Sequence, residues 1–277
     1  MHSTSSMSWF GRLSLGGGLA FLYLPIVVLV VYSFNASKLV SVWAGFSLGW
    51  YQTLFDDEAV MAAFGLSLKV ALLASAMSVV LGTLAGLVLA RFGPFRGKSL
   101  FAGMLTAPMV MPEVITGLSM LLLFVSMQQW VGFPEERGVL TIWVGHVTLC
   151  TAYVTVVIRS RLVEMDRSLE EAAMDLGARP LKIFFVITLP LILPAIASGF
   201  LLSFTLSLDD LVMTAFLSGP GSTTLPQLIF SRVRLGLNPE INALGTLTVL
   251  VVAVLVISAN RIMLRQEKRR AALAAAS

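Results

Sequence analysis

The sequence predicts an all-α membrane protein with six transmembrane helices. Of its 277 residues, 57% are hydrophobic and only 12% are charged, and the mean hydropathy is +0.89. A soluble domain carries about twice that charged fraction, so lipid is the expected solvent for most of the chain. The apolar residues gather in long runs, and no alternating segment of about ten residues recurs, as a membrane barrel would require.

Six apolar runs are long enough to cross a bilayer as helices, which takes about 20 residues. The first run exceeds the hydrophobic region of a signal peptide, and no small-residue cleavage site follows it promptly, so we expect an uncleaved helix. A helical membrane domain of this size is one unit, 13–264, between tails 1–12 and 265–277. The six predicted spans are Leu13–Tyr32, Ala62–Ala90, Leu100–Gln128, Val139–Ile158, Leu191–Leu217 and Ile241–Leu264.

Positive charge is distributed unevenly over the segments that connect the spans. With six spans, both termini lie on one side of the membrane, and fourteen of the nineteen Lys and Arg residues fall on that side. Because Lys and Arg accumulate in the cytoplasm, both termini are predicted to be cytoplasmic, and the basic pI needs no nucleic acid. The fourteen are Arg12, Arg91, Arg96, Lys98, Arg159, Arg161, Arg167, Arg179, Lys182, Arg261, Arg265, Lys268, Arg269 and Arg270; the opposite side has Lys38, Arg137, Arg232 and Arg234.

The longest predicted cytoplasmic segment, 159–190, contains a short predicted helix, Leu169–Leu176. Ser168 and Glu171 have the spacing of a capping box at the start of a helix. Glu170 and Glu171 fall in the first turn, where carboxylates interact favourably with the helix dipole. The pattern therefore predicts a two-turn helix outside the membrane.

The end of this helix is equally well marked. Gly177 stands where the residue after a helix needs a positive φ, and Pro180 prevents the helix from continuing. Ala172 and Ala173 leave one flank smooth enough for another surface to approach closely. On these grounds alone, a plain connection between spans and a docking surface are equally good interpretations.

A longer pattern runs through the same loop. Its fixed positions are Glu171-Ala172-Ala173, Gly177, Ile187 and Leu189-Pro190. This pattern resembles the EAA motif in the permease subunits of ATP-binding-cassette (ABC) importers, with every fixed position present. The resemblance implies a type I ABC importer permease fold with a short cytoplasmic coupling helix. It also implies that these residues couple closure of a cytosolic ATPase subunit to movement of the spans.

The chain carries no enzyme signature of its own. It lacks the G-x-x-x-x-G-K-[ST] loop that cradles phosphates, a Ser/His/Asp arrangement and a paired-His metal site. We therefore expect no cofactor and no catalytic residues, and ATP hydrolysis is expected to reside in a partner chain.

Apart from histidine, and from Arg261 at the cytoplasmic end of the last span, four ionisable residues fall inside predicted spans. Each costs at least about 2.5–3.5 kcal/mol at the centre of a span and is a functional candidate. Glu113 and Asp209 lie towards the middle of their spans, and Lys69 lies nearer the outer face. Asp210 follows Asp209, so the two side chains point about 100° apart on a helix. We expect one to face a cargo path and the other to cap or pair locally. Lys69 is a candidate partner for one acid, and His146 is expected to be a packing histidine whose hydrogen bonds are satisfied.

Two prolines support a cavity beside Glu113. Pro108 and Pro112 lie on one face of the predicted helix, where they free backbone carbonyls and bend it. Such carbonyls are tolerated at membrane depth where they line a cavity or are buried in protein. The three acids less Lys69 leave an excess of about two negative charges, a field that stabilises a dication or trication and disfavours an anion.

A second resemblance narrows the class of molecule that the transporter is expected to carry. Five segments are similar to the inner-membrane permeases of putrescine and spermidine importers, and more narrowly to the second permease of a putrescine system, over about Phe21 to Asn260. Glu113 departs from this pattern, because the family leads us to expect Asp there. The segments are Ser33-Phe34-Asn35, Val42-Trp43-Ala44-Gly45, Met111-Pro112-Glu113-Val114-Ile115-Thr116-Gly117, Leu206-Ser207-Leu208-Asp209-Asp210 and Asn238-Pro239-Glu240-Ile241-Asn242-Ala243-Leu244.

This resemblance implies a polyamine as the cargo and a bacterial inner-membrane location. It also implies a second homologous permease, a dimer of cytosolic ATPase subunits and a periplasmic binding protein as partners. The same class of importer with ferric iron, sulfate, molybdate or thiamine as cargo is an alternative, although the acids argue against the anions. An ion-coupled secondary transporter is a further alternative, but the inverted repeats common in such folds are not evident.

Overall fold

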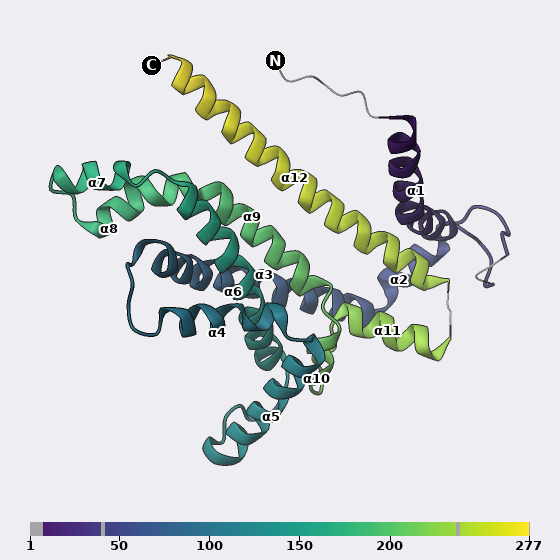
Figure 1. The fold of residues 1–277 in the computed structure, drawn as a ribbon. Coiled ribbons are helices and arrows are strands. Elements are labelled where there is room, and N and C mark those ends of the chain that lie inside the picture. The colour runs from purple at the N-terminus through teal and green to yellow at the C-terminus, as the bar shows by residue number, and fades with distance from the viewer. Residues whose placement is uncertain (1–7, 40–41, 237–238, 277) are drawn as a thin grey trace. The chain divides into compact units, whose positions relative to one another are not determined.

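A computed structural model describes residues 8–39, 42–236 and 239–276, with the side chains described up to Ser258 and at Arg261. This part of the chain forms twelve α-helices and one π-helix (Figure 1). Six helices in it are long and apolar enough to cross a membrane, which confirms the predicted fold class and number of spans. They are Trp9–Tyr32, Glu58–Arg91, Glu113–Val131, Val139–Glu164, Pro180–Leu208 and Glu240–Ser258.

The described residues form two compact units. Among these residues, the first unit comprises 8–39, 42–61, 229–236 and 239–255, and the second comprises 62–228 and 256–276. The first unit contains α1 (Trp9–Tyr32), α2 (Gly49–Asp56) and parts of α11 (Leu225–Leu235) and α12 (Glu240–Ala276). Within it α1 and α12 approach closely, because a Cβ on Gly245 would lie 3.2 Å from a methyl group of Leu29.

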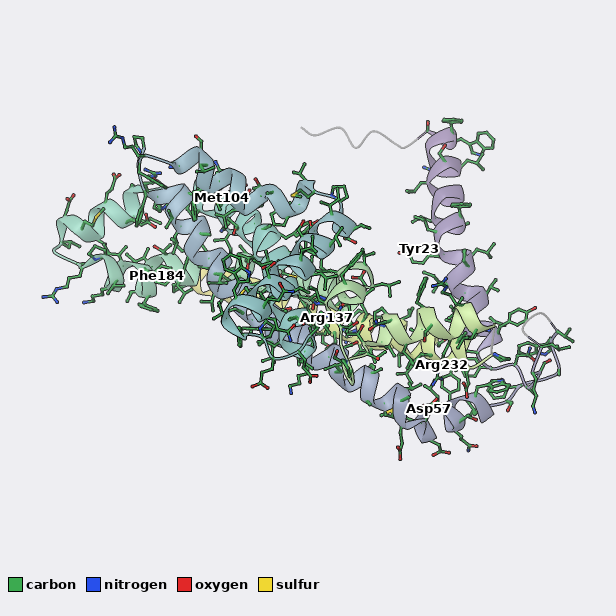
Figure 2. The ribbon with its side chains drawn as sticks, turned by 90° about the horizontal axis from the view of Figure 1, so that it is seen from below. Tyr23, Asp57, Met104, Arg137, Phe184 and Arg232 are labelled. Carbon is green, nitrogen blue, oxygen red and sulfur yellow. The ribbon has the colours of Figure 1, made fainter. Side chains whose placement is uncertain are left out.

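Two polar centres organise the first unit. Asn35 is buried and fastens the loop after α1: its side-chain amide donates to the Val42 carbonyl and accepts from the Ala44 amide. Arg232 of α11 bonds Asp57, which caps α3 (Glu58–Arg91) (Figure 2). This hydrogen bond holds the pKa of Asp57 below its ordinary value.

The second unit is built around α6 (Val139–Glu164), whose most apolar stretch is two-thirds buried. Glycines let α3 approach it: a Cβ on Gly82 would lie 2.6 Å from Val154, and one on Gly86 would lie 3.0 Å from Ile158. Gly199 of α9 (Leu189–Leu208) also faces Val154, but less tightly, because a Cβ there would lie 3.4 Å from this side chain. Such small residues are a common device for close helix packing in membranes, where the hydrophobic effect does not drive helices together.

The structure corrects two predicted spans, each of which contains a break. The predicted span Leu100–Gln128 is instead α4 (Lys98–Val110) followed by α5 (Glu113–Val131). Pro112 has no amide hydrogen, and the residue before it adopts an extended conformation with ψ of 140°. The predicted span Leu191–Leu217 likewise ends early: α9 stops at Leu208, and α10 (Val212–Leu217) follows.

Candidate functional site

The break between α9 and α10 is built around Asp210, which is 8% exposed. Its carboxylate accepts the backbone amides of Met213, at 3.3 Å, and Thr214, at 2.8 Å, and the Thr214 hydroxyl at 2.7 Å. Asp210 therefore satisfies the first amides of α10, as a helix cap does. Asp210 is thus the aspartate of the pair that bonds locally. Neither aspartate lies on a helix, because α9 ends at Leu208 and α10 begins at Val212, so the separation of about 100° expected for a helix does not apply.

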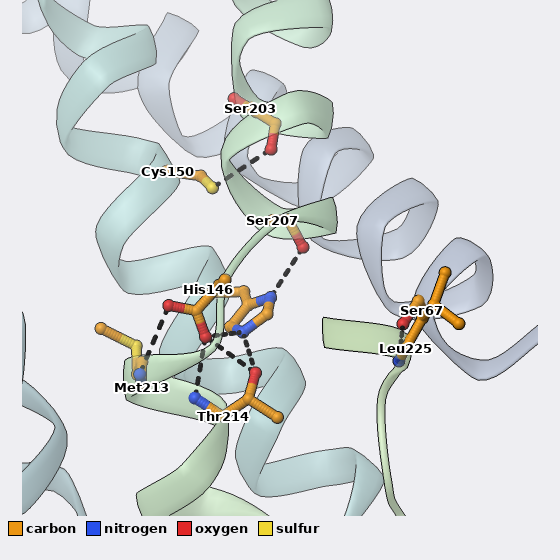
Figure 3. Close-up of polar contacts among 9 residues, drawn as sticks. Ser67, His146, Cys150, Ser203, Ser207, Met213, Thr214 and Leu225 are labelled. Carbon is orange, nitrogen blue, oxygen red and sulfur yellow. Dashed lines mark hydrogen bonds and ion pairs between the residues drawn. The ribbon is translucent and has the colours of Figure 1, made fainter. Parts of the chain in front are cut away.

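His146 of α6 fastens this break to the centre of the second unit (Figure 3). Its Nδ1 lies 2.7 Å from the Ser207 hydroxyl, and its Nε2 lies 3.1 Å from Asp210 and 3.0 Å from Thr214. The Thr214 hydroxyl donates its hydrogen to Asp210, so it cannot also donate to Nε2 of His146. Nε2 is therefore assigned as the protonated ring nitrogen, which donates to Asp210 and Thr214. The ring thus joins α6 to both α9 and α10, and both of its nitrogens have partners, as expected of a packing histidine whose hydrogen bonds are satisfied.

The break between α4 and α5 adjoins a cavity of about 220 Å³. Pro108 lies in this cavity and cannot supply an amide to the carbonyl one turn earlier, that of Met104, which also lines it. Thr116 and Ser119 add hydroxyl groups to the lining. The remaining lining residues are Ala107, Met111, Met120 and Leu123.

The two breaks lie close together in the second unit. Helices α5 and α10 pack against each other, and a Cβ on Gly117 would lie 2.8 Å from the Phe216 ring. Glu113 begins α5, Asp209 follows α9, and both side chains are exposed. The Asp209 carboxylate lies within electrostatic range of Glu113, Asp210 and His146. The structure therefore brings the three predicted acids together at two interruptions of the helices.

Lys69 stands apart from the acids. It is exposed on α3 and forms no ion pair with any residue that the structure describes. Its neighbour Ser67 is buried and accepts the backbone amide of Leu225 at 2.7 Å. The suggested pairing of Lys69 with an intramembrane acid is therefore absent from this structure.

The predicted cytoplasmic helix is α7 (Ser168–Asp175), which begins one residue earlier than expected. The capping box does not form, because Ser168 is itself helical; its amide donates at 2.9 Å to Asp166, which lowers the pKa of that carboxyl. Gly177 has the predicted positive φ, +81°. Its amide bonds the Met174 carbonyl and the next amide bonds Ala173, the pattern of a Schellman ending.

The residues of the EAA pattern divide between two places. Glu171, Ala172 and Gly177 are exposed on and after α7, and Ala173 is half-buried there. Exposed apolar side chains accompany them: Leu169, Met174 and Leu176. The others lie beyond α8 (Pro180–Ile183), on the π-helix η1 (Phe184–Thr188) and at the start of α9: Ile187, Leu189 and Pro190.

A family model for the inner membrane component of binding-protein-dependent transport systems matches residues 82–272 of this chain. The chain belongs to this family. The permease is 62% identical over 253 residues to the "Putrescine transport system permease protein PotI" of Escherichia coli K12, across 91% of this chain and 90% of that one. It is 38% identical to the "Spermidine/putrescine transport system permease protein PotC" of the same strain, across 91% and 94% of the two chains.

The fold agrees with this membership. The permease superposes with a TM-score of 0.75 on a chain of a bacterial ABC transporter "involved in the import of the acidic polysaccharide alginate", at 18% identity and over 91% of this chain and 92% of that one. It is thus an ABC importer permease of the inner membrane that crosses the bilayer several times, and a transport subunit rather than an enzyme.

Sequence reasoning missed the partners of two side chains of the permease, Glu170 and His146. It noted Glu170 only for its place in the first turn of a helix, yet this side chain forms an ion pair with Arg91 and accepts a hydrogen bond from Thr188. No local pattern marks that cluster, because its members are far apart in the sequence. The role of His146 could have been inferred from the sequence. The spacing of Asp210 and Thr214 is typical of an aspartate that caps the start of a helix. A buried carboxylate in that position needs a further hydrogen-bond donor, and His146 is a candidate.

Proposed function

We propose that this permease forms, with a second homologous permease, the transmembrane path of an ATP-driven importer of putrescine or a close polyamine. The gathering of Glu113, Asp209 and Asp210 at two adjoining helix breaks carries the cargo assignment. The names of the relatives at 62% and 38% identity, which refer to putrescine and spermidine, support it.

The electrostatic argument separates classes of cargo. An ammonium that leaves water for a narrow cavity loses hydration worth several kcal/mol, and fixed carboxylates along the route offset that loss. Asp210 is already occupied by capping and by His146, so Asp209 and Glu113 are the acids with exposed carboxylates. They must not hold a dication too tightly, because transport requires release as well as entry.

The surface and the sequence of the chain support the proposed assembly. The apolar stretch of α5 is only 11% buried in the single chain, which leaves a face for a second permease and lipid to cover. The exposed Glu171, Ala172 and apolar residues of α7 are the proposed docking surface for a cytosolic ATPase dimer. A periplasmic binding protein would deliver the cargo, as the family description indicates.

The test of the cargo is an uptake panel in a bacterial strain that lacks its own polyamine importers. Cells expressing the complete system are offered radiolabelled putrescine, spermidine, sulfate, thiamine and ferric iron. We expect uptake of putrescine or spermidine that requires this chain and is lost when the ATPase subunit is inactivated. Uptake of an oxyanion without any polyamine would contradict the proposal, and polyamine uptake that survives ATPase inactivation would indicate a secondary transporter.

A further inference from the structure

The end of α3 and the start of α7 are joined by two side-chain contacts that reach in opposite directions. Arg91 is the last residue of α3, and its Nε lies 2.8 Å from Oε2 of Glu170. Arg167, immediately before α7, donates to the Ala90 carbonyl at 2.6 Å. A cation at this carbonyl also complements the negative end of the helix dipole.

The second oxygen of Glu170 is used by a third element. The Thr188 hydroxyl, at the end of η1, donates to Oε1 at 2.8 Å. Thr188 is only 2% exposed. One carboxylate therefore connects α3, α7 and the segment that leads into α9.

The π-helical turn at Thr188 has an identifiable cause. Pro190 has no amide hydrogen to offer the Val186 carbonyl one turn earlier. The Leu189 amide instead bonds the carbonyl of Phe184, five residues back. The widened turn ends at Thr188, and its hydroxyl bonds Glu170.

The ion pair between Arg91 and Glu170 is mostly shielded from solvent, so its loss would be costly. The side chains of Arg91 and Glu170 are 12% and 13% exposed, whereas Glu171 is exposed. Nε and Nη2 of Arg91 are buried and have no hydrogen-bond partner among the described residues. The ion pair with Glu170, at 2.8 Å, is therefore the contact that compensates the charge of this guanidinium. Removal of one partner from a buried ion pair leaves an uncompensated charge, which is much more costly than the loss of a surface pair.

We infer that Glu170 is a positioning residue for coupling: through Arg91 and Thr188 it makes α7, α3 and the start of α9 move as one body. This inference rests on the proposed function, in which α7 docks on the ATPase through Glu171 and its exposed neighbours. Glu170 faces inward and carries the displacement of α7 to two spans. Loss of Glu170 then leaves docking intact and separates ATP hydrolysis from transport.

The experiment compares five variants in the complete transporter. They are Glu170→Gln, Thr188→Val, the charge swap that combines Arg91→Glu with Glu170→Arg, and each member of that swap alone. Putrescine uptake and ATP hydrolysis stimulated by the binding protein are measured per assembled complex. We expect Glu170→Gln and the single charge reversals to lower uptake per ATP hydrolysed about tenfold, within the range for residues that carry coupling. The charge swap should recover most of the loss, and Thr188→Val should show a smaller one.

The matched control is Glu164→Gln, which removes an acid of the exposed Arg161–Glu164 pair nearby and should transport like the unmodified complex. Unchanged uptake per ATP in both Glu170→Gln and Thr188→Val would overturn the inference, as would a charge swap no better than its single members. Failure of the proposed cargo is distinguishable, because then even the unmodified complex imports no polyamine. In that case, the response of ATP hydrolysis to the binding protein in Glu170→Gln still tests the inference.

Discussion

Gly177 combines a backbone φ of +81° with open space around the position where a Cβ would stand. A side chain there would therefore meet no clash, and its whole cost is backbone strain. A β-branched residue at positive φ is strained by about 1–3 kcal/mol, which is enough to displace the end of a helix as short as α7.

We predict that Gly177→Val leaves membrane insertion near normal but abolishes uptake by intact cells. The matched control is Gly177→Asn, because asparagine tolerates this region of φ far better. The measurements are permease abundance in membranes, ATPase recruitment and putrescine uptake. Normal uptake with Gly177→Val would refute the docking role of this loop.

The end of α7 could be predicted from sequence because glycine and proline act within a few residues. The start was placed one residue late, since Asp166 rather than Ser168 supplies the capping oxygen. The environment of Glu170 could not be predicted, because Arg91 and Thr188 approach it only when three helices have packed. Glu113, Asp209 and Asp210 could be identified from the sequence, because a charged residue in a membrane span is energetically costly. That they lie near one another at two helix breaks could be seen only in the structure.

Close contact between α3 and α6 depends on glycines that leave no room for a methyl group. A Cβ on Gly82 would lie 2.6 Å from Val154 and 3.1 Å from the Thr155 backbone nitrogen. Because backbone cannot yield as a flexible side chain does, α3 would have to move away from α6. The predicted spans identified the two helices, but only the packed structure shows that they meet at these positions.

We predict that Gly82→Ala lowers the stability of the permease by about 1–3 kcal/mol, as overpacking of a close interface does. Gly103→Ala is the control: this glycine lies in α4 with nothing within 4 Å of its missing Cβ, and alanine there should stabilise the helix by about 0.5–1 kcal/mol. Thermal unfolding in detergent measures both. Equal stability of the two variants would contradict the packing argument.

The junction before α3 gives a prediction for pH. The hydrogen bond from Arg232 lowers the pKa of Asp57 from its ordinary value of 3.8, so the ionised carboxylate stabilises the folded state. That contribution is complete above 3.8 and is lost as the pH falls through the lowered folded-state pKa. Arg232→Gln removes this contact together with the 3.5 Å ion pair to Glu240. It should therefore lower the unfolding temperature at neutral pH, with a difference that shrinks as the carboxylates are protonated below pH 3.8. A difference that is constant with pH would show that the contacts of Arg232 with carboxylates do not stabilise the fold.

For the whole molecule, the distribution of charge predicts the orientation in the membrane. The segment around Lys38 should lie outside the cell and the segment around Arg96 inside, with both termini cytoplasmic. Lys38→Cys and Arg96→Cys are a matched pair of exposed basic positions, introduced after the buried Cys150 is replaced by alanine. A membrane-impermeant maleimide added to intact cells should label only position 38. Labelling only at position 96 would reverse the topology.

The central claim is that carboxylates at the two breaks ease the passage of a polyamine cation. Asp209→Asn and Glu113→Gln keep the shape of each side chain and remove its charge, whereas a binding protein would set most of the affinity. The most direct measurement is the initial rate of radiolabelled putrescine uptake over a range of concentrations. Both variants should show a lower maximal rate, with a smaller change in the half-saturating concentration. Maximal rates equal to that of the unmodified permease would contradict the claim and make the acids structural.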